Sequence, residues 1–145
     1  MTASLSILLP TDGSPSAHEA ARHVVHLAGL GLAVDVHLLS VQTPLRGSAA
    51  VLIGAAQLND WHREEGMKTL AGCDAILTGA GIKAHLHVGL GDAAETVIAF
   101  AARLGCAQIV MGSRGHGLAV GLVLGSVANG VVAGCALPVT LIRTT

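Results

Sequence analysis

The chain has 145 residues, the size of one domain that can bury an apolar core without disulfides or a structural metal. Charged residues make up 12%, the net charge is -1 and Lys68 and Lys83 are the only lysines, so nucleic-acid binding is not expected. The three cysteines are odd in number and lie among apolar residues, which favours buried thiols of a cytoplasmic protein over a disulfide framework or a zinc site.

Apolar periodicity predicts two strands and two helices in the first half of the chain. Residues 5–9 form a continuous apolar run that ends in a Pro-Thr-Asp-Gly-Ser loop, a pattern typical of a buried strand. A helix is expected from Pro15 to near Gly29, where its apolar stripe ends. Residues 34–41 then predict a second strand, and residues 49–78 a long helix that three glycines weaken.

The second half continues the alternation of strands and helices. Residues 82–88 place apolar side chains on one face and Lys83, His85 and His87 on the other, as in an edge strand with one wet face. The later segments are a helix that follows Gly91-Asp92 and ends at Arg103, a strand at 108–111, a helix at 126–134 and a strand at 139–142. This order predicts one α/β domain, a doubly wound parallel sheet with helices on both faces.

An uncharged stretch at residues 118–142 also allows the hypothesis of a membrane helix. Ser126, Asn129 and above all Pro138 interrupt it, which favours a helix followed by a short strand. The N-terminus shows no charged segment before an apolar run, so a secretory signal is not expected either. We therefore expect no association with a membrane.

Two loops that follow predicted strands have the composition of a phosphate site. Gly112 and Gly115 follow one strand, and nine residues later comes Gly125-Ser126 at a helix start, where bare amides suit an anion. The other loop is 10–14. Both loops belong at the carboxyl ends of strands, where doubly wound sheets bind ligands. Neither a Walker A loop nor a Rossmann fingerprint fits, because no lysine follows Lys83 and the glycine spacing differs.

This G-x2-G-x9-G-S pattern, with the Asp-Gly-Ser loop at residues 12–14, resembles the ATP-binding subgroup of the universal stress protein family. The resemblance spans essentially the whole chain, including Gly89-x-Gly91-Asp92 and Leu137-Pro138-Val139. It implies a single domain over residues 1–145 and a five-stranded sheet of order 3-2-1-4-5. It also implies a stress-response protein that binds ATP, with Mg²⁺ held by the phosphates, often as a homodimer.

The resemblance also implies which residues contact the nucleotide. Asp12 is expected beside the ribose or adenine, the backbone of Val41 at adenine, and Arg114 along the phosphates. The complete set is Pro10, Thr11, Asp12, Val41, Met111, Gly112, Arg114, Gly115, Gly125, Ser126, Val127 and Ala128. No catalytic residue and no metal ion held by the protein itself is expected.

The residues alone leave other functions open. Glycines after a strand also suit a tight turn, and Asp12 before Gly-Ser-Pro suits a turn or a helix cap. A very slow ATPase would use Asp12 or His116 to orient water, although these loops lack a lysine and a second acidic residue. A third possibility is an interaction module without nucleotide, a homodimer through the last strand, from Leu137 to Arg143.

Two further features stand apart from the family pattern. Gly130 and Gly134 cost the helix at 126–134 about 1 kcal/mol each relative to alanine, which predicts a soft helix or one whose outer face is covered by a partner. The pairs His23/His26 and His85/His87 each share a face and could ligate a metal ion. No third ligand has an assigned position near either pair, so exposed histidines without a metal are expected.

Overall fold

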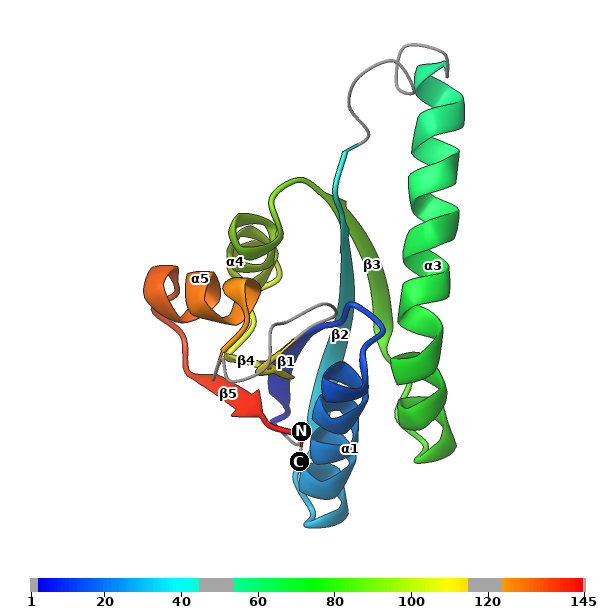
Figure 1. Cartoon of the computed structure of the whole chain (residues 1–145). Helices are drawn as coiled ribbons and strands as arrows, with labels where there is room; N and C mark the ends of the chain where they lie inside the picture. Colours follow the sequence, from blue (N-terminus) through cyan, green and yellow to red (C-terminus); the bar gives the residue numbers. More distant parts are fainter. Residues whose placement is uncertain (1–2, 45–53, 115–123, 145) are drawn as a thin grey trace.

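A five-stranded parallel sheet with the order β3-β2-β1-β4-β5 organises the molecule (Figure 1). The structure is a computed structural model that describes residues 3–44, 54–114 and 124–144. Its strands are β1 (Leu5–Pro10), β2 (Val34–Gln42), β3 (His85–Leu90), β4 (Gln108–Gly112) and β5 (Val139–Ile142). The fold class and strand order expected from the sequence are confirmed.

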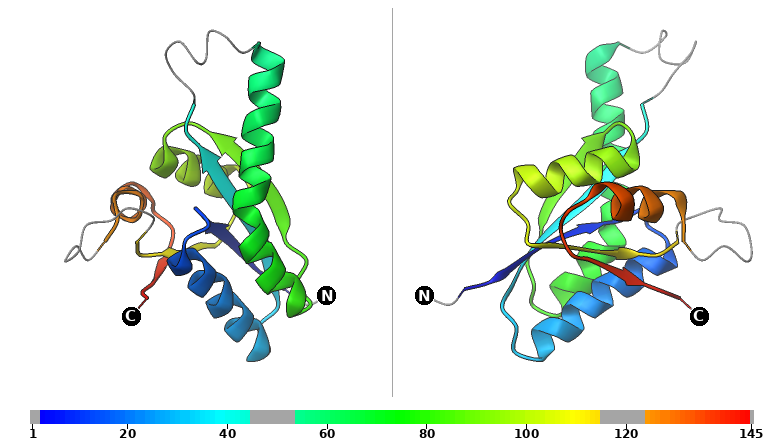
Figure 2. Two further views of the ribbon diagram at one scale, coloured as in Figure 1. Left: turned by 45° about the vertical axis from the view of Figure 1, so that its right-hand side comes forward. Right: turned by 90° about the vertical axis from the view of Figure 1, so that its left-hand side faces the viewer.

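Helices cover both faces of this sheet. They are α1 (Pro15–Gly29), α3 (Ala55–Gly79), α4 (Ala93–Arg103) and α5 (Ser126–Gly134). The helices α1 and α3 lie on one face, and α4 and α5 lie on the other (Figures 1 and 2). No helix within the described ranges is long and apolar enough to cross a membrane.

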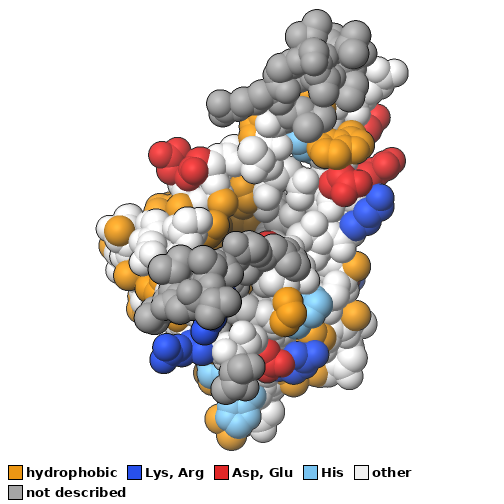
Figure 3. Space-filling model, viewed as in Figure 1, with side chains coloured by type: hydrophobic (Ala, Val, Ile, Leu, Met, Phe, Trp, Pro, Cys, Tyr) orange, Lys and Arg blue, Asp and Glu red, His pale blue; other side chains and the backbone are white. Residues whose placement is uncertain are grey.

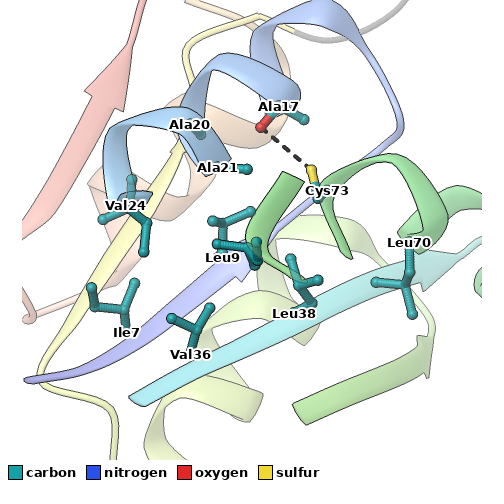
Figure 4. Packing of buried hydrophobic residues seen from close by; sticks show 12 residues of the cluster. Ile7, Leu9, Ala17, Ala20, Ala21, Val24, Val36, Leu38, Leu70 and Cys73 are labelled. Atoms are coloured by element: carbon teal, nitrogen blue, oxygen red, sulfur yellow. Dashed lines mark hydrogen bonds between the residues drawn. The ribbon is translucent and has the colours of Figure 1, made fainter. Parts of the chain in front are cut away.

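The continuous apolar runs arise because both faces of the central strands are buried. Ile7 and Leu9 of β1 pack toward α1 and α3, where Val24 and Leu70 meet them (Figure 4). Leu8, which points to the opposite face, belongs to the core beneath α4 and α5. All three β1 side chains are fully buried, so alternation is absent from the sequence of this strand.

The long helix begins later than the sequence indicates. Gly54 has φ -64° and ψ 153°, an extended conformation, and caps α3, so the helix starts at Ala55 instead of Ala49. The predicted part at residues 49–53 lies outside the described residues. The end of the helix is close to the prediction, at Gly79.

The third strand is shifted relative to the predicted 82–88. The Ile82 amide donates to the Leu77 carbonyl at 2.9 Å, so this residue closes the end of α3 instead of pairing in the sheet. Pairing with β2 starts at His85 and extends to Leu90, opposite Gln42. The predicted edge position is confirmed.

The glycines of α5 face α4 within the same chain. A Cβ atom built on Gly134 would lie 2.9 Å from Cδ1 of Ile98, and Gly130 lies against Ala94. The glycines thus permit close approach of the two helices. This contact accounts for their positions without a partner molecule.

Candidate functional site

A cavity of about 580 Å³ lies at the carboxyl ends of β1, β2 and β4, beside the N-terminus of α5. It occupies the place where the chain turns from one side of the sheet to the other, between β1 and β4. In the space-filling view, hydrophobic side chains gather over α4 and α5 and border a hollow in the surface (Figure 3).

The structure brings the predicted contact residues together around this cavity. Those in the described ranges all line it: Pro10, Thr11, Asp12, Val41, Met111, Gly112, Arg114, Gly125, Ser126, Val127 and Ala128. Gly115 and His116 lie outside the described residues. The two loops, about a hundred residues apart in the chain, therefore meet at one site.

Other lining residues were missed from the sequence: Ser14, Ala17, Leu39, Ala93, Val97, Ser113, Leu124 and Asn129. Leu39 could have been found, because it lies two residues before Val41 and shares its side of the strand. Ala93 and Val97 carried no such signal, since their place depends on how α4 packs over the sheet.

The N-terminus of α5 opens toward the cavity without a side-chain cap. Its capping residue is Gly125, with φ -72° and ψ 166°. By contrast, α1 is capped by the Ser14 hydroxyl, and the Asp92 carboxylate accepts from the Glu95 amide at 3.1 Å in α4. The first amides of α5, at cavity-lining residues, are therefore placed to donate to an anion.

The loop after β1 is held by its own side chains. Thr11 Oγ1 accepts from the Gly13 amide at 3.0 Å, and Asp12 Oδ1 accepts from the Ser14 amide at 2.9 Å. Gly13 has φ +79°, a conformation that favours glycine. The turn role considered for Asp12 is thus present, while the residue also lines the cavity.

This geometry agrees with comparisons to known proteins. The model of the universal stress protein family matches residues 5–143. The chain belongs to this family. It is 27% identical over 143 residues to universal stress protein MJ0531 of Methanocaldococcus jannaschii, covering 94% of this chain and 81% of that protein.

Solved structures also resemble this universal stress protein over nearly its full length. The protein MJ0577 superposes with a TM-score of 0.83 at 28% identity and 99% coverage of both chains. A universal stress protein family member from Burkholderia pseudomallei gives a TM-score of 0.70 at 26% identity and 96% coverage of both. The family assignment therefore rests on both sequence and fold.

Within the family motif, Gly112 has a packing role of its own. A Cβ atom at this position would lie 2.8 Å from the backbone carbon of Ser16, at the start of α1. Such a distance is too short for a real side chain, so β4 and α1 need glycine here whether or not a ligand binds. The Ser16 hydroxyl also donates to the Ile142 carbonyl at 3.2 Å, which ties α1 to β5.

Ser113 presents a buried hydroxyl at the cavity. The residue is 1% exposed, and its Oγ has no hydrogen-bond partner among the described residues. Its backbone is satisfied, because its amide donates to Ile142 at 2.9 Å and its carbonyl accepts from Gly125 at 2.7 Å. Buried polar groups usually have hydrogen-bond partners, so a polar atom of a bound ligand would supply the partner for the Ser113 hydroxyl.

The buried thiol of Cys73, on α3, contacts the loop after β1. Cys73 Sγ donates toward Thr11 Oγ1 at 3.4 Å and lies 3.5 Å from the Ala17 carbonyl oxygen (Figure 4). Burial raises the pKa of the Cys73 thiol, which keeps it a neutral donor. This contact holds Thr11 in place at the edge of the cavity.

The described lining combines apolar walls with two charges, on Asp12 and Arg114. Leu39, Val41 and Met111 offer surface for a flat apolar group, and the α5 amides offer donors for an anion. The described lining contains no pair of acidic or basic side chains of the kind that general acid–base catalysis uses.

Proposed function

We propose that this protein binds ATP, with Mg²⁺ on the phosphates, and acts in the stress response as a nucleotide-responsive homodimer. The observation that carries the proposal is the uncapped N-terminus of α5, which opens into the same cavity as Asp12 and Arg114. A volume of about 580 Å³ falls within the usual range for small-molecule sites.

Adenine nucleotides occur in proteins of the same fold. One solved universal stress protein is a complex with cAMP, at 21% identity and a TM-score of 0.72. A family member from Arabidopsis thaliana has AMP bound, at 16% identity. One from Archaeoglobus fulgidus is in complex with dAMP, at 22% identity. At these identities the likeness concerns the fold, and the choice of nucleotide for this chain rests on its own cavity.

Each part of ATP has a matching part of the cavity. Adenine would lie against the apolar surface of β2 near Val41, with the ribose near Asp12. The phosphates would accept hydrogen bonds from the α5 amides and the Ser126 hydroxyl, and Arg114 would offset their charge. Bound Mg²⁺ would neutralise phosphate charge, and the phosphates would supply its ligands.

ATP hydrolysis, if it occurs, is expected to be slow. Asp12 is the only acidic side chain in the described lining, and Arg114 the only cation. Stabilising the charge that develops in phosphoryl transfer normally requires several positioned cations. We therefore assign a binding role and no catalytic residue.

Gly125 offers a sharp test of the proposed site. Its φ of -72° is open to any residue, so Gly125→Asp would cap α5 and place a carboxylate where a phosphate would bind. Calorimetry with Mg·ATP should show saturable binding in the wild type and none in Gly125→Asp, while the melting temperature is kept. Gly125→Ser, a neutral cap, should retain binding. Equal ATP binding by the Asp variant, or no binding by the wild type, would refute the proposal.

A further inference from the structure

A cluster of one aspartate and three histidines lies on β2 and β3, away from the cavity. Asp35 and His37 are on β2, and His85 and His87 are on β3. His37 is paired with His85, and Leu39 with His87, so alternate residues of the two strands lie side by side on one face. The cluster is therefore a product of strand register and not of sequence proximity.

The position of the cluster separates it from the nucleotide cavity. Asp35 and His37 are in the first half of β2, whereas Leu39 and Val41 of the same strand line the cavity. His37 and Val41 are four residues apart along the strand, about 13 Å. The face is the one that carries α4, since His87 lies 5.9 Å from the Phe100 ring, centroid to centroid.

The side chains converge on the Asp35 carboxylate. His85 Nε2 lies 3.1 Å from Oδ1 of Asp35, and His37 Nε2 lies 3.6 Å from its Oδ2. One ligand atom from each of these three residues lies within 4.8 Å of the others. Tetrahedral zinc ligands at about 2.0–2.1 Å from the ion stand about 3.3 Å apart. The His37 and His85 rings are stacked, with centroids 4.7 Å apart at 23°, so they must rotate for both nitrogens to face one ion.

We propose that Asp35, His37 and His85 bind a first-row divalent transition-metal ion, for which Zn²⁺ is the probe. Two imidazole nitrogens and one carboxylate suit these ions better than Mg²⁺ or Ca²⁺, which prefer oxygen ligands alone. The side chain of His85 is 59% exposed and that of Asp35 43%, so an ion can enter from solvent and retain water as a further ligand.

His87 is the positioning residue of this site. Its Nε2 lies 2.9 Å from Nδ1 of His37. With a metal on Nε2 of His37, the Nδ1 proton of that ring is donated to His87, which fixes both tautomer and ring orientation. The side chain of His37 is 12% exposed, so this hydrogen bond is formed in a largely buried setting.

The structure provides the additional metal ligands that could not be identified from the sequence. The pair His85/His87 had no identifiable third ligand, and the β2–β3 register brings Asp35 and His37 to it. The other pair, His23/His26 on α1, has ring centroids 6.4 Å apart. The described residues place no carboxylate with it in a metal-binding cluster, so it makes a matched control.

The test is a calorimetric titration with Zn²⁺ of untagged, chelator-treated protein in the absence of nucleotide. The wild type should bind one Zn²⁺ per chain, and Co²⁺ in its place should give the visible absorption of a four-coordinate site. Asp35→Asn and His85→Ala should each weaken Zn²⁺ binding by more than about tenfold, and His87→Gln by about 10- to 100-fold. Zn²⁺ should raise the melting temperature of the wild type more than that of any of these three variants.

The double variant His23→Ala/His26→Ala should bind Zn²⁺ as the wild type does, and so should Cys135→Ser, which removes the partly exposed thiol. Circular dichroism of each metal-free variant establishes that it is folded. The proposal is wrong if the wild type shows no saturable Zn²⁺ binding, or if Asp35→Asn and His85→Ala bind Zn²⁺ like the wild type. Because nucleotide is absent throughout, neither result bears on ATP binding.

Discussion

A Cβ atom on Gly130 of α5 would lie 2.6 Å from the Cβ of Ala94 on α4. Real side-chain atoms do not approach so closely, so the two helices pack at a distance that only glycine allows at this position. The N-terminus of α5 lies at the cavity, and its position over the sheet depends in part on this contact.

Gly130→Ala tests the packing directly. Helix propensity alone would stabilise the protein by about 1 kcal/mol, but forcing α5 away from α4 costs about 1–3 kcal/mol. We expect a net loss of stability and a melting temperature lower by several degrees. Combining it with Ala94→Gly should recover part of the loss in a double-mutant cycle.

Gly29→Ala is the matched control, because a Cβ at the end of α1 meets nothing within 4 Å. This substitution should leave the melting temperature unchanged or slightly higher. If Gly130→Ala instead stabilises the protein as much as helix propensity predicts, the close contact with α4 is absent.

The thiols should differ in reactivity. Cys73 and Cys106 are buried and their pKa values are raised, chiefly by burial, so little reactive thiolate forms. Cys135 is only partly buried. A disulfide reagent such as DTNB should therefore modify one thiol per folded chain rapidly and the other two only on unfolding. Loss of the rapid phase in Cys135→Ser would confirm the assignment, and two rapid thiols in the wild type would contradict it.

The buried Cys73 thiol also predicts an alkaline loss of stability. Its pKa is raised above the ordinary 9.0, so the folded state holds this proton more tightly than the unfolded state. Its contribution is complete below about pH 9 and disappears as the pH rises through the raised folded-state value. Urea unfolding of Cys73→Val should show a smaller decline than the wild type between neutral and alkaline pH. Identical slopes would show that another group causes the decline.

The edge strand β5 predicts a specific effect of proline on the proposed dimer. The Pro138 carbonyl accepts from the Ile109 amide of β4 at 3.0 Å, and the Ile142 carbonyl accepts at 2.9 Å from the amide of the residue directly after β4. In a parallel ladder the backbone groups of Val139 and Leu141 therefore face the open edge. Val139→Pro removes one outward amide and leaves the pairing with β4 in place, whereas Val139→Thr keeps that amide. Light scattering at micromolar concentration should give a dimer for the wild type and Val139→Thr and a monomer for Val139→Pro. A monomeric wild type would contradict the dimer.

Much of the fold could be predicted because local signals and tertiary structure agree. Pro15 and Gly29 mark the limits of α1, and the buried run at residues 5–9 is a central strand covered on both faces. Loops that follow parallel strands meet at one end of the sheet, which is why distant residues such as Asp12 and Gly125 could be assigned to one site.

The remaining features depend on contacts that the sequence does not display. The meeting of Asp35 with His85 requires the register of β2 against β3. The reason for glycine at position 112 is the close approach of Ser16, and Gly130 is explained by Ala94. In each case the feature depends on a residue 30 or more positions away in the chain. The periodicity within one segment therefore cannot predict it.

Arg114 should discriminate between nucleotides by their phosphates. As the only cation in the described lining, it contributes to ATP more than to adenosine, which has no phosphate. Arg114→Gln should weaken ATP binding by about tenfold, corresponding to about 1.4 kcal/mol, and leave adenosine binding nearly unchanged. An equal loss for both ligands would place Arg114 away from the phosphates.

The most direct test of the account is native mass spectrometry of the untagged protein mixed with Mg²⁺ and ATP. We expect saturable binding of one ATP per chain, retained as ATP over the time of the experiment and abolished by Gly125→Asp. If the wild type shows no saturable binding of ATP, or if Gly125→Asp binds ATP equally well, a nucleotide site at the N-terminus of α5 is contradicted.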